Sequence, residues 1–317
     1  MHIVMLEPLG VSEEKIMRLA KNFAEAGHQF DFCKNKTTDE DELCKRASDA
    51  DILIIANSPL SGKVIRSAKN LKMISVAFTG IDHVDIAACK EKGITVCNAQ
   101  GYSTDAVAEL TFGLILALLR NILPCNDRTK EGKTKDGLVG NELYGKTIGI
   151  VGTGAIGKRV AQIAKVFGCK VLGYSRSKNQ EAVDLGIEYT DLDTLMKTSD
   201  IVSLHIPLTD ETKHLINDKN ISLMKPNSLL INVARGGVVD SSALAKALNE
   251  GKIAGAGIDV FEMEPPVPTD HPLLNAKNVV LTPHVAFATE ESMYRRAQIT
   301  LDNISFWMDG KPKNVKL

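Results

Sequence analysis

The sequence predicts an α/β protein built from two doubly wound domains, each with a parallel sheet between two layers of helices. Short apolar runs alternate with helix-length amphipathic segments through the first hundred residues, and a second such series begins at residue 147. The length of 317 residues also exceeds what one core usually serves, because domains of roughly 100 to 200 residues are the norm. We therefore expect one domain from residues 1–100 and 287–317, with a second domain, residues 101–286, inserted into it.

In the first domain, apolar runs predict five strands. They cover residues 2–6, 30–33, 51–56, 73–78 and 95–97. Ser12 is the N-cap expected for a helix over residues 13–26, which Gly27 ends, and Ser61 opens a helix that ends near Asn70. A last helix over residues 290–308 follows the final strand of the second series, and we assign it to the first domain.

In the second domain, apolar runs predict six strands. They cover residues 147–151, 170–174, 201–205, 228–233, 255–259 and 279–282. We expect a helix over residues 158–167 and a helix over residues 105–119 that crosses between the domains; the segment after His284 crosses back. The polar stretch 126–141 predicts a loop or a short surface helix.

Composition limits the partners that we expect. The 38 basic and 39 acidic residues give a formal net charge of -1, so no strong field attracts nucleic acid or an anionic membrane. The first residues lack the features of a signal peptide, and the longest apolar run, residues 110–119, is about half the length of a membrane span of roughly 20 residues. The six cysteines show no C-x-x-C spacing, so we expect no metal site and reduced thiols in a cytoplasmic protein with a small-molecule partner.

The segment Gly152-Thr153-Gly154-Ala155-Ile156-Gly157 matches the G-x-G-x-x-G pattern of dinucleotide-binding turns. Alone the pattern is weak, but here an apolar strand precedes it and an amphipathic helix follows it. The first glycine allows a tight turn, the second lets the backbone approach a pyrophosphate, and the third permits close packing of helix and strand. The helix N-terminus then offers N–H groups to the phosphates. The alternative is a glycine-rich turn that binds nothing.

The next strand ends at Tyr174-Ser175-Arg176-Ser177, where NAD-binding proteins place a carboxylate for the adenosine ribose. This segment holds an arginine and two hydroxyls instead. Such groups bind a 2'-phosphate through charge-assisted hydrogen bonds, so we expect NADPH to be favoured over NADH. The alternative for Arg176 is a solvated loop arginine.

Three further loops follow strand ends and carry Arg235, Glu264 and His284. Ligands of open α/β sheets gather at the carboxyl ends of strands, so these side chains are expected to converge beside a nicotinamide. A protonated imidazole is a natural proton donor to a ketone oxygen that gains negative charge, and a carboxylate on its other nitrogen favours the charged ring. An arginine fork suits a substrate carboxylate. Each residue alone also fits an ordinary surface charge.

Together with these loops, the chain resembles the D-isomer-specific 2-hydroxyacid dehydrogenase family over essentially its whole length. The motifs that carry the resemblance are Gly152 to Gly157, His205-Ile206-Pro207-Leu208-Thr209, Asn232-Val233-Ala234-Arg235-Gly236-Gly237, Asp259 to Pro265 and Pro283-His284, with Phe78 to Asp85 and Tyr102-Ser103-Thr104 in the first domain. The resemblance implies a flavodoxin-like substrate domain and a Rossmann cofactor domain. It also implies dimerisation through the cofactor domain.

By the same resemblance, Arg235 binds the substrate carboxylate and carbonyl, His284 is the acid/base, and Glu264 is its partner. The implied substrate contacts are Asn57, Phe78, Thr79, Gly80, Arg235 and His284. The implied cofactor contacts are Thr104, Gly152, Thr153, Gly154, Ala155, Ile156, Gly157, Ser175, Arg176, Ser177, His205, Ile206, Pro207, Thr212, Val233, Ala234, Arg235, Asp259, His284 and Ala286. The implied reaction is hydride transfer between NAD(P)H and C2 of a small 2-keto or 2-hydroxy acid of the D series.

Several functions remain open. A hydroxypyruvate or glyoxylate reductase is favoured, because Val76 stands where phosphoglycerate dehydrogenases of the family typically carry an arginine for the distal phosphate. D-3-phosphoglycerate dehydrogenase is the alternative enzyme. A protein of another class, a corepressor that binds the dinucleotide and recruits partners, shares the scaffold and keeps the catalytic residues.

Overall fold

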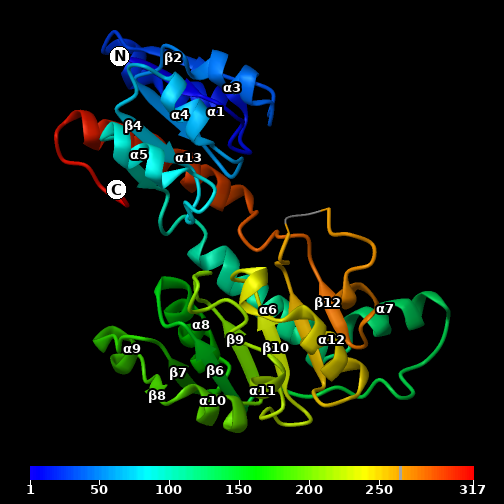
Figure 1. The fold of residues 1–317 in the computed structure, drawn as a ribbon. Helices are drawn as coiled ribbons and strands as arrows, with labels where there is room; N and C mark the ends of the chain where they lie inside the picture. Colours follow the sequence, from blue (N-terminus) through cyan, green and yellow to red (C-terminus); the bar gives the residue numbers. More distant parts are fainter. Residues whose placement is uncertain (264–265) are drawn as a thin grey trace. The chain divides into compact units, whose positions relative to one another are not determined.

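The structure is a computed structural model that describes residues 1–263 and 266–317. Contacts between residues divide the chain into two compact units (Figure 1). The first unit comprises Met1–Ser103 and Ala288–Leu317, and the second comprises Thr104–Phe287. Each unit contains one parallel sheet with helices on both faces, which confirms the predicted fold class.

The sheet of the first unit has the strand order β2-β1-β3-β4-β5, and every pair of neighbours is parallel. The strands are β1 (His2–Met5), β2 (Gln29–Phe32), β3 (Ile52–Ile55), β4 (Met73–Val76) and β5 (Thr95–Asn98). This order, 2-1-3-4-5, is that of flavodoxin-like sheets. The last residues of the chain join the same sheet region, since Val96 donates its N–H to the Leu317 carbonyl.

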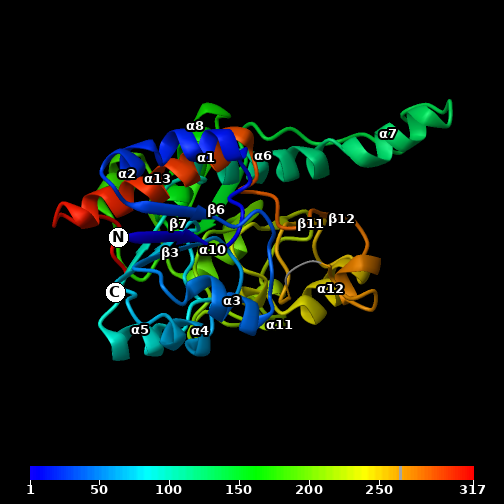
Figure 2. The same ribbon diagram turned by 90° about the horizontal axis from the view of Figure 1, so that it is seen from above.

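Helices cover both faces of this sheet (Figure 2). One layer contains α1 (Glu13–Leu19), α2 (Lys21–Glu25) and α13 (Glu290–Met308), and the other contains α3 (Glu40–Ala47), α4 (Gly62–Ser67) and α5 (Ile86–Lys92). The apolar face of α13 supplies Ala297, Leu301 and Ile304 to the core between it and the strands. The Ser75 hydroxyl in β4 also donates to the Thr300 carbonyl at 2.8 Å, which fixes α13 against the sheet.

Two expected helices are shorter than predicted. The expected helix over residues 13–26 is broken, because Phe23 donates its N–H to the Ala20 carbonyl, three residues back, and this tight turn separates α1 from α2. The helix opened by Ser61 ends at Ser67, since Ala68 has extended backbone angles. Lys92 donates to the Ile65 and Ala68 carbonyls and so satisfies groups that the end of α4 leaves unpaired.

The sheet of the second unit has the order β12-β11-β10-β9-β6-β7-β8 and is also parallel throughout. Its strands are β6 (Thr147–Val151), β7 (Lys170–Tyr174), β8 (Glu188–Tyr189), β9 (Ile201–Leu204), β10 (Leu229–Asn232), β11 (Gly255–Ile258) and β12 (Val279–Leu281). Counted within this unit the order is the Rossmann order 3-2-1-4-5-6, extended by one strand. The strand order reverses between β6 and β9, which opens a crevice at their carboxyl ends where ligands of such sheets bind.

Both faces of this sheet are also covered. Alternate residues of β10 point to opposite faces: Leu229 and Ile231 join one core with residues of α6 (Thr104–Leu119) and α8 (Ala155–Val166), and Leu230 joins the other. That second core includes residues of α10 (Leu192–Thr198), α11 (Asp218–Ile221) and α12 (Ser241–Asn249). The remaining elements are α9 (Gln180–Asp184) and the 3-10 helices η1 (Gly236–Val238) and η2 (Pro272–Asn275).

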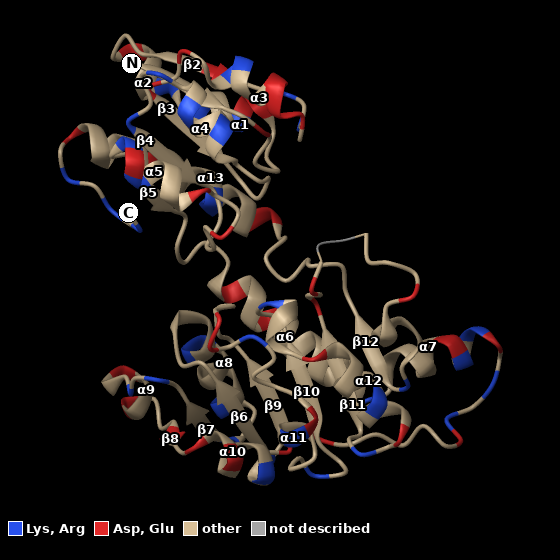
Figure 3. Ribbon diagram, viewed as in Figure 1, with Lys and Arg blue, Asp and Glu red and all other residues tan. Residues whose placement is uncertain are grey.

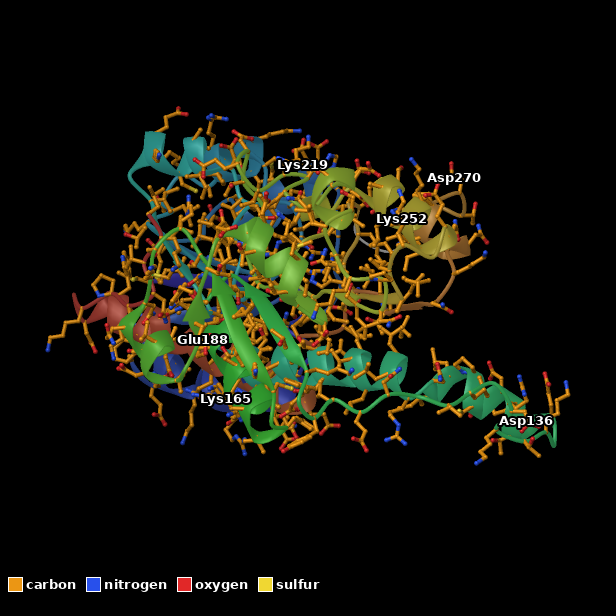
Figure 4. All side chains as sticks on the ribbon, turned by 90° about the horizontal axis from the view of Figure 1, so that it is seen from below. Asp136, Lys165, Glu188, Lys219, Lys252 and Asp270 are labelled. Carbon is orange, nitrogen blue, oxygen red and sulfur yellow. The ribbon has the colours of Figure 1, made fainter. Side chains whose placement is uncertain are left out.

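The helix α7 (Ile122–Lys130) and the loop after it form an arm that extends away from the second unit (Figures 1 and 2). No residue of α7 is buried. The arm turns back at its tip, near the labelled Asp136 (Figure 4), and returns to α6, where Asn141 donates its N–H to the Leu119 carbonyl at 2.7 Å. Among the described residues, no single helix is long and apolar enough to cross a membrane.

Candidate active site

The glycine-rich turn between β6 and α8 has the geometry that a dinucleotide pyrophosphate requires. Gly152 has a φ of +100°, and a Cβ there would lie 2.5 Å from the His205 carbonyl oxygen. A Cβ on Gly157 would lie 2.0 Å from the Gly152 oxygen, so α8 packs directly on the turn. At Gly154, the N-cap of α8, a Cβ would meet no atom within 4 Å. The turn is therefore closed by protein at two glycines and open at the third, beside the N-terminus of α8, and this space fits a pyrophosphate.

His205 lies directly after β9, on the other side of the switch point. Its Nε2 lies 2.8 Å from the Ser203 hydroxyl, and its backbone oxygen faces Gly152. Burial lowers the pKa of His205 to about 3, so the ring is neutral at every pH at which the protein would work. In the loop that follows, the Thr212 hydroxyl donates to the Pro207 carbonyl at 2.7 Å, which holds that loop in a compact turn.

The loop after β7 carries the predicted 2'-phosphate group. Arg176 is exposed and its Nη1 lies 3.0 Å from the carboxylate of Glu211, which is exposed too. Ser175 is half-buried and Ser177 is exposed. The pairing with Glu211 was not predicted from the sequence, since 35 residues separate the two and nothing local marks either one.

Arg235 follows β10 and begins η1. Its guanidinium donates to the Ala234 carbonyl at 2.8 Å, and the Asn232 side chain accepts from the N–H of Ala234 and donates to the carbonyl of Arg235. A Cβ on Gly236 would lie 1.8 Å from the carbonyl carbon of Phe261, so the backbone of this loop packs directly on the loop after β11. The half-buried Arg235 is thus held from two sides at the carboxyl edge of the sheet.

His284 lies in the loop after β12 and has a φ of +56°, a left-handed conformation that residues other than glycine seldom adopt. Asp259, at the end of β11, holds that loop. Its carboxylate is fully buried and accepts from the Thr282 hydroxyl at 2.6 Å and from the N–H groups of Val285 and Ala286 at 2.9 Å. The N–H of His284 donates to the Asp259 carbonyl at 2.7 Å. Burial raises the pKa of the Asp259 carboxyl, although these hydrogen bonds act in the opposite direction.

The resemblance implied that Asp259 is a cofactor contact, and the structure adds a role that was not predicted: the carboxylate anchors the His284 loop. The ring of His284 packs edge-on against Phe287, with centroids 5.4 Å apart. The third predicted catalytic residue, Glu264, lies outside the described residues. Of the other predicted cofactor contacts, Val233 and Ala286 are buried and Thr104 begins α6.

In the first unit, two buried polar side chains hold the predicted substrate loops. Glu7 follows β1, and its carboxylate accepts from the N–H groups of Ala56 and Ser58 and from the Ser58 hydroxyl at 2.7 to 3.0 Å. This leaves the side chain of Asn57 exposed at the tip of the loop after β3. Asn98, at the end of β5, donates to the Thr79 carbonyl at 2.6 Å.

Phe78 precedes the loop that contains Thr79 and is buried just after β4. Its ring centroid lies 6.3 Å from those of His83 and Tyr102. The predicted substrate contacts of the first unit thus gather at the carboxyl edge of its sheet. The sequence carries a signal for Glu7, because a carboxylate directly after an apolar strand is unusual.

Three features define the class of this protein. They are the Rossmann strand order, the glycine turn beside a helix N-terminus, and the placement of Arg235 and His284 after two strands of one sheet. Together they are typical of dinucleotide-binding oxidoreductases. The comparison with protein families is more specific. Residues 112–286 match the family model of the D-isomer specific 2-hydroxyacid dehydrogenase, NAD binding domain. The chain belongs to the D-isomer specific 2-hydroxyacid dehydrogenase family, whose members are oxidoreductases that act on CH–OH groups with a nicotinamide cofactor.

Curated relatives agree with this assignment. The chain is 45% identical to a hydroxypyruvate reductase of Thermotoga maritima, over 81% of this chain and 84% of that one. It is 45% identical to a glyoxylate reductase of Thermofilum pendens, over 86% of this chain and 82% of that one. A D-3-phosphoglycerate dehydrogenase of Methanocaldococcus jannaschii is 42% identical over 86% of this chain and 52% of its own length.

Solved structures resemble the whole chain. An acyclic imino acid reductase in complex with NADPH and D-Arg superposes with a TM-score of 0.89 at 33% identity, and the match covers 100% of both chains. A D-lactate dehydrogenase from Aquifex aeolicus, complexed with NAD and lactic acid, gives a TM-score of 0.83 at 34% identity over 98% of this chain and 96% of that one. These neighbours and the family model support a nicotinamide cofactor for this chain.

Proposed function

We propose that this enzyme reduces hydroxypyruvate or glyoxylate to the D-2-hydroxy acid, with NADPH favoured over NADH. The observation that carries the proposal is the placement of Arg235 and His284. They follow β10 and β12, the two strands that flank β11, and the loops that hold both are fixed to the end of β11 by Phe261 and Asp259. The curated relatives named as hydroxypyruvate and glyoxylate reductases support this substrate class.

The residues divide the chemistry between them. When bound, the dihydronicotinamide supplies the hydride that reaches C2 of the keto acid. The guanidinium of Arg235 pairs with the substrate carboxylate and fixes the carbonyl. The protonated ring of His284 gives its proton to the carbonyl oxygen as negative charge develops there, and Glu264 is proposed to hold the ring in its charged form.

The tail of the acid is proposed to contact Asn57 and Phe78, with the backbone at Thr79 and Gly80 beside the carboxylate. Val76, where phosphoglycerate dehydrogenases of the family typically place an arginine, is fully buried in β4 and offers no charge to a phosphate. This favours the small uncharged tails of glyoxylate and hydroxypyruvate. The phosphoglycerate dehydrogenase alternative is supported by relatives at 42% and 37% identity.

The proposal is tested by kcat/KM for a panel of 2-keto acids, with 3-phosphohydroxypyruvate included, together with Arg235→Lys. We expect glyoxylate or hydroxypyruvate to be the best substrate. Arg235→Lys should lose most of kcat/KM, since an ammonium cannot reproduce the bidentate fork. Near-normal turnover in Arg235→Lys would remove the carboxylate-binding role, and a preference for the phosphorylated acid would favour the alternative.

We further propose that two copies of the chain associate through the cofactor unit, with the arm as the contact. A nine-residue helix without buried side chains is not stable in water on its own, so α7 needs a surface to cover it. Ile122, Leu123 and Val139 are exposed on the arm, and a groove of about 560 Å³ lined by Leu118, Leu123 and Val280 lies at its base. Basic and acidic residues are interspersed along the arm (Figure 3), which suits self-association better than binding to a charged partner.

A further inference from the structure

A second feature of the cofactor unit is the short strand β8, which consists of only Glu188 and Tyr189. The hydroxyl of Tyr189 lies 2.6 Å from the Thr153 hydroxyl and 3.2 Å from the backbone nitrogen of Asn179. Thr153 belongs to the glycine turn after β6 and is 3% exposed. Asn179 is the N-cap of α9 and ends the loop that begins at Ser175. One side chain therefore joins the two segments expected to hold the two halves of the bound ADP moiety.

The direction of the first of these hydrogen bonds follows from the groups present. An amide N–H can only donate, so Asn179 donates to the Tyr189 oxygen. In the second bond, either the Tyr189 or the Thr153 hydroxyl supplies the hydrogen, because both groups can donate and accept. The Tyr189 hydroxyl is thus hydrogen-bonded to both segments at once.

The neighbouring strand and core pack against Tyr189. Gly173, in the neighbouring strand β7, makes room for this arrangement: a Cβ there would lie 2.5 Å from Ile187 and 3.1 Å from the Thr153 methyl group. Tyr189 itself is half-buried and packs on the core that α8 covers. A further ion pair, between Lys158 in the first turn of α8 and Glu181 in α9, ties the same two segments together on the outside.

We propose that Tyr189 is a positioning residue for the cofactor. It fixes the distance between the pyrophosphate turn at Gly154 and the loop that carries Arg176, and it touches neither the nicotinamide nor the acid. The inference rests on the proposed cofactor site at these two segments. Loss of the hydroxyl lets the loop shift relative to the turn, so both halves of the ADP moiety can no longer be bound at once without reordering the loop.

The test is calorimetric measurement of Kd for NADPH, NADH and ADP-ribose, which lacks the nicotinamide, in Tyr189→Phe and Thr153→Val. We expect each variant to bind all three ligands about 5- to 50-fold more weakly, which is the range for one or two lost hydrogen bonds. In Tyr189→Phe, the kcat at saturating cofactor should stay within about twofold of the wild type. Tyr144→Phe, which removes the hydroxyl of an exposed tyrosine in the same unit, is the matched control and should bind like the wild type.

The double variant Tyr189→Phe/Thr153→Val separates a shared bridge from two unrelated losses. If the two hydroxyls form one bridge, the Kd of the double variant should be at most about twofold higher than that of the single variant that binds more weakly. If the two losses are independent, the fold-changes in Kd of the two single variants multiply. Thr153→Ser, which keeps the hydroxyl, should bind like the wild type. An unchanged Kd in Thr153→Val would contradict the proposal even if Tyr189→Phe does not fold. Unchanged Kd values, multiplied effects, or a loss of kcat with normal ADP-ribose binding would each overturn the proposal.

None of these affinities depends on which acid is reduced. An error in the proposed substrate would therefore appear in the 2-keto acid panel and leave the ADP-ribose affinities of these variants as expected.

Discussion

Arg176 is paired with Glu211 at 3.0 Å, and both side chains are more than 70% exposed. An exposed pair of this kind contributes little to stability, about 0 to 1 kcal/mol. However, the Glu211 carboxylate then pairs with the guanidinium that is proposed to bind a 2'-phosphate. This ion pair has to break before the guanidinium can bind the phosphate. Glu211 would thus weaken a preference for NADPH that Arg176 creates.

Changing each partner tests this. In Arg176→Ala, we expect the preference for NADPH to fall about tenfold or more, since a charge-assisted phosphate contact contributes roughly 1.5 to 3 kcal/mol. In Glu211→Gln, NADPH should bind about two- to fivefold more tightly at low salt, with NADH unchanged. The measurement is kcat/KM for both cofactors at two ionic strengths. An Arg176→Ala enzyme with an unchanged KM for NADPH would exclude the phosphate role.

His284 and His205 lie at the same sheet edge, and only His284 is proposed to give a proton to the substrate. Reduction needs a protonated donor, so kcat/KM for keto-acid reduction should fall at alkaline pH, and oxidation of the alcohol should show the opposite dependence. His284→Ala should abolish this decline, the alkaline limb of the pH profile, and should lower kcat about a hundred- to ten-thousandfold. Glu264→Gln should move the limb to lower pH. A residual rate within tenfold of wild type in His284→Ala would be too high for an acid catalyst.

His205 provides the control. Its pKa of about 3 lies far below the working range, so His205→Asn should leave the alkaline limb where it is, even if cofactor binding weakens.

The effect of His205 on stability has a defined sign: a histidine with a depressed folded-state pKa binds its proton only after unfolding. The unfolding free energy should therefore fall as pH drops from about 6.5 toward 3, and His205→Asn should flatten that slope.

Among the elements, the loop after β12 has a conformation that is set mainly by hydrogen bonds to one carboxylate outside the loop. The Asp259 side chain accepts three hydrogen bonds from residues 282–286, and this network keeps His284 in its left-handed conformation. Asp259→Asn would replace one acceptor with a donor that faces an N–H group. We expect the variant to unfold about 2 kcal/mol more easily and to lose kcat by about tenfold or more, because the loop loosens.

Thr282→Val, which removes only one of the three bonds, is the graded control and should have a smaller effect on both quantities. The pH dependence adds a check. Since burial raises the folded-state pKa of Asp259, its contribution to stability is full below about 3.8 and is lost as pH rises through the folded value. Asp259→Asn should lack this decline, and an unchanged kcat in the variant would show that His284 is held by other contacts.

The same elements show what the sequence could predict. The helix over residues 290–308 was predicted with the bounds that the structure shows, because a run of nineteen residues is long enough to give a helical signal. β8 was missed, since two residues are too few for any period. The hydrogen bonds of Asp259 to Thr282, of Arg176 to Glu211 and of Tyr189 to Thr153 join residues 23 to 36 positions apart. No local pattern records which side chains meet across such a separation.

At the scale of the whole molecule, the proposed dimer through the arm can be tested by its mass. Light scattering behind gel filtration should give twice the chain mass of 34.4 kDa. The double variant Leu123→Asp/Val139→Asp places charge on the exposed apolar side chains of the arm and should shift the mass toward that of one chain. Val183→Asp, on the exposed surface of α9, is the control. A wild-type chain that remains a monomer at high micromolar concentration would contradict the proposed dimer.

The insertion of the second unit into the first has a consequence for the order in which the protein folds during synthesis. Residues 104–287 leave the ribosome as one continuous unit, whereas the first unit waits for α13, which completes its core, and for Leu317, which bonds to β5. Residues 1–103 should thus mature after residues 104–287, although they are made first, with one face of their sheet covered by α1 and α2 alone in the meantime. A chain stopped at Phe287 should show protease-resistant residues 104–287 and rapid cleavage within 1–103; protection of both segments would show that the first unit folds without its last helix.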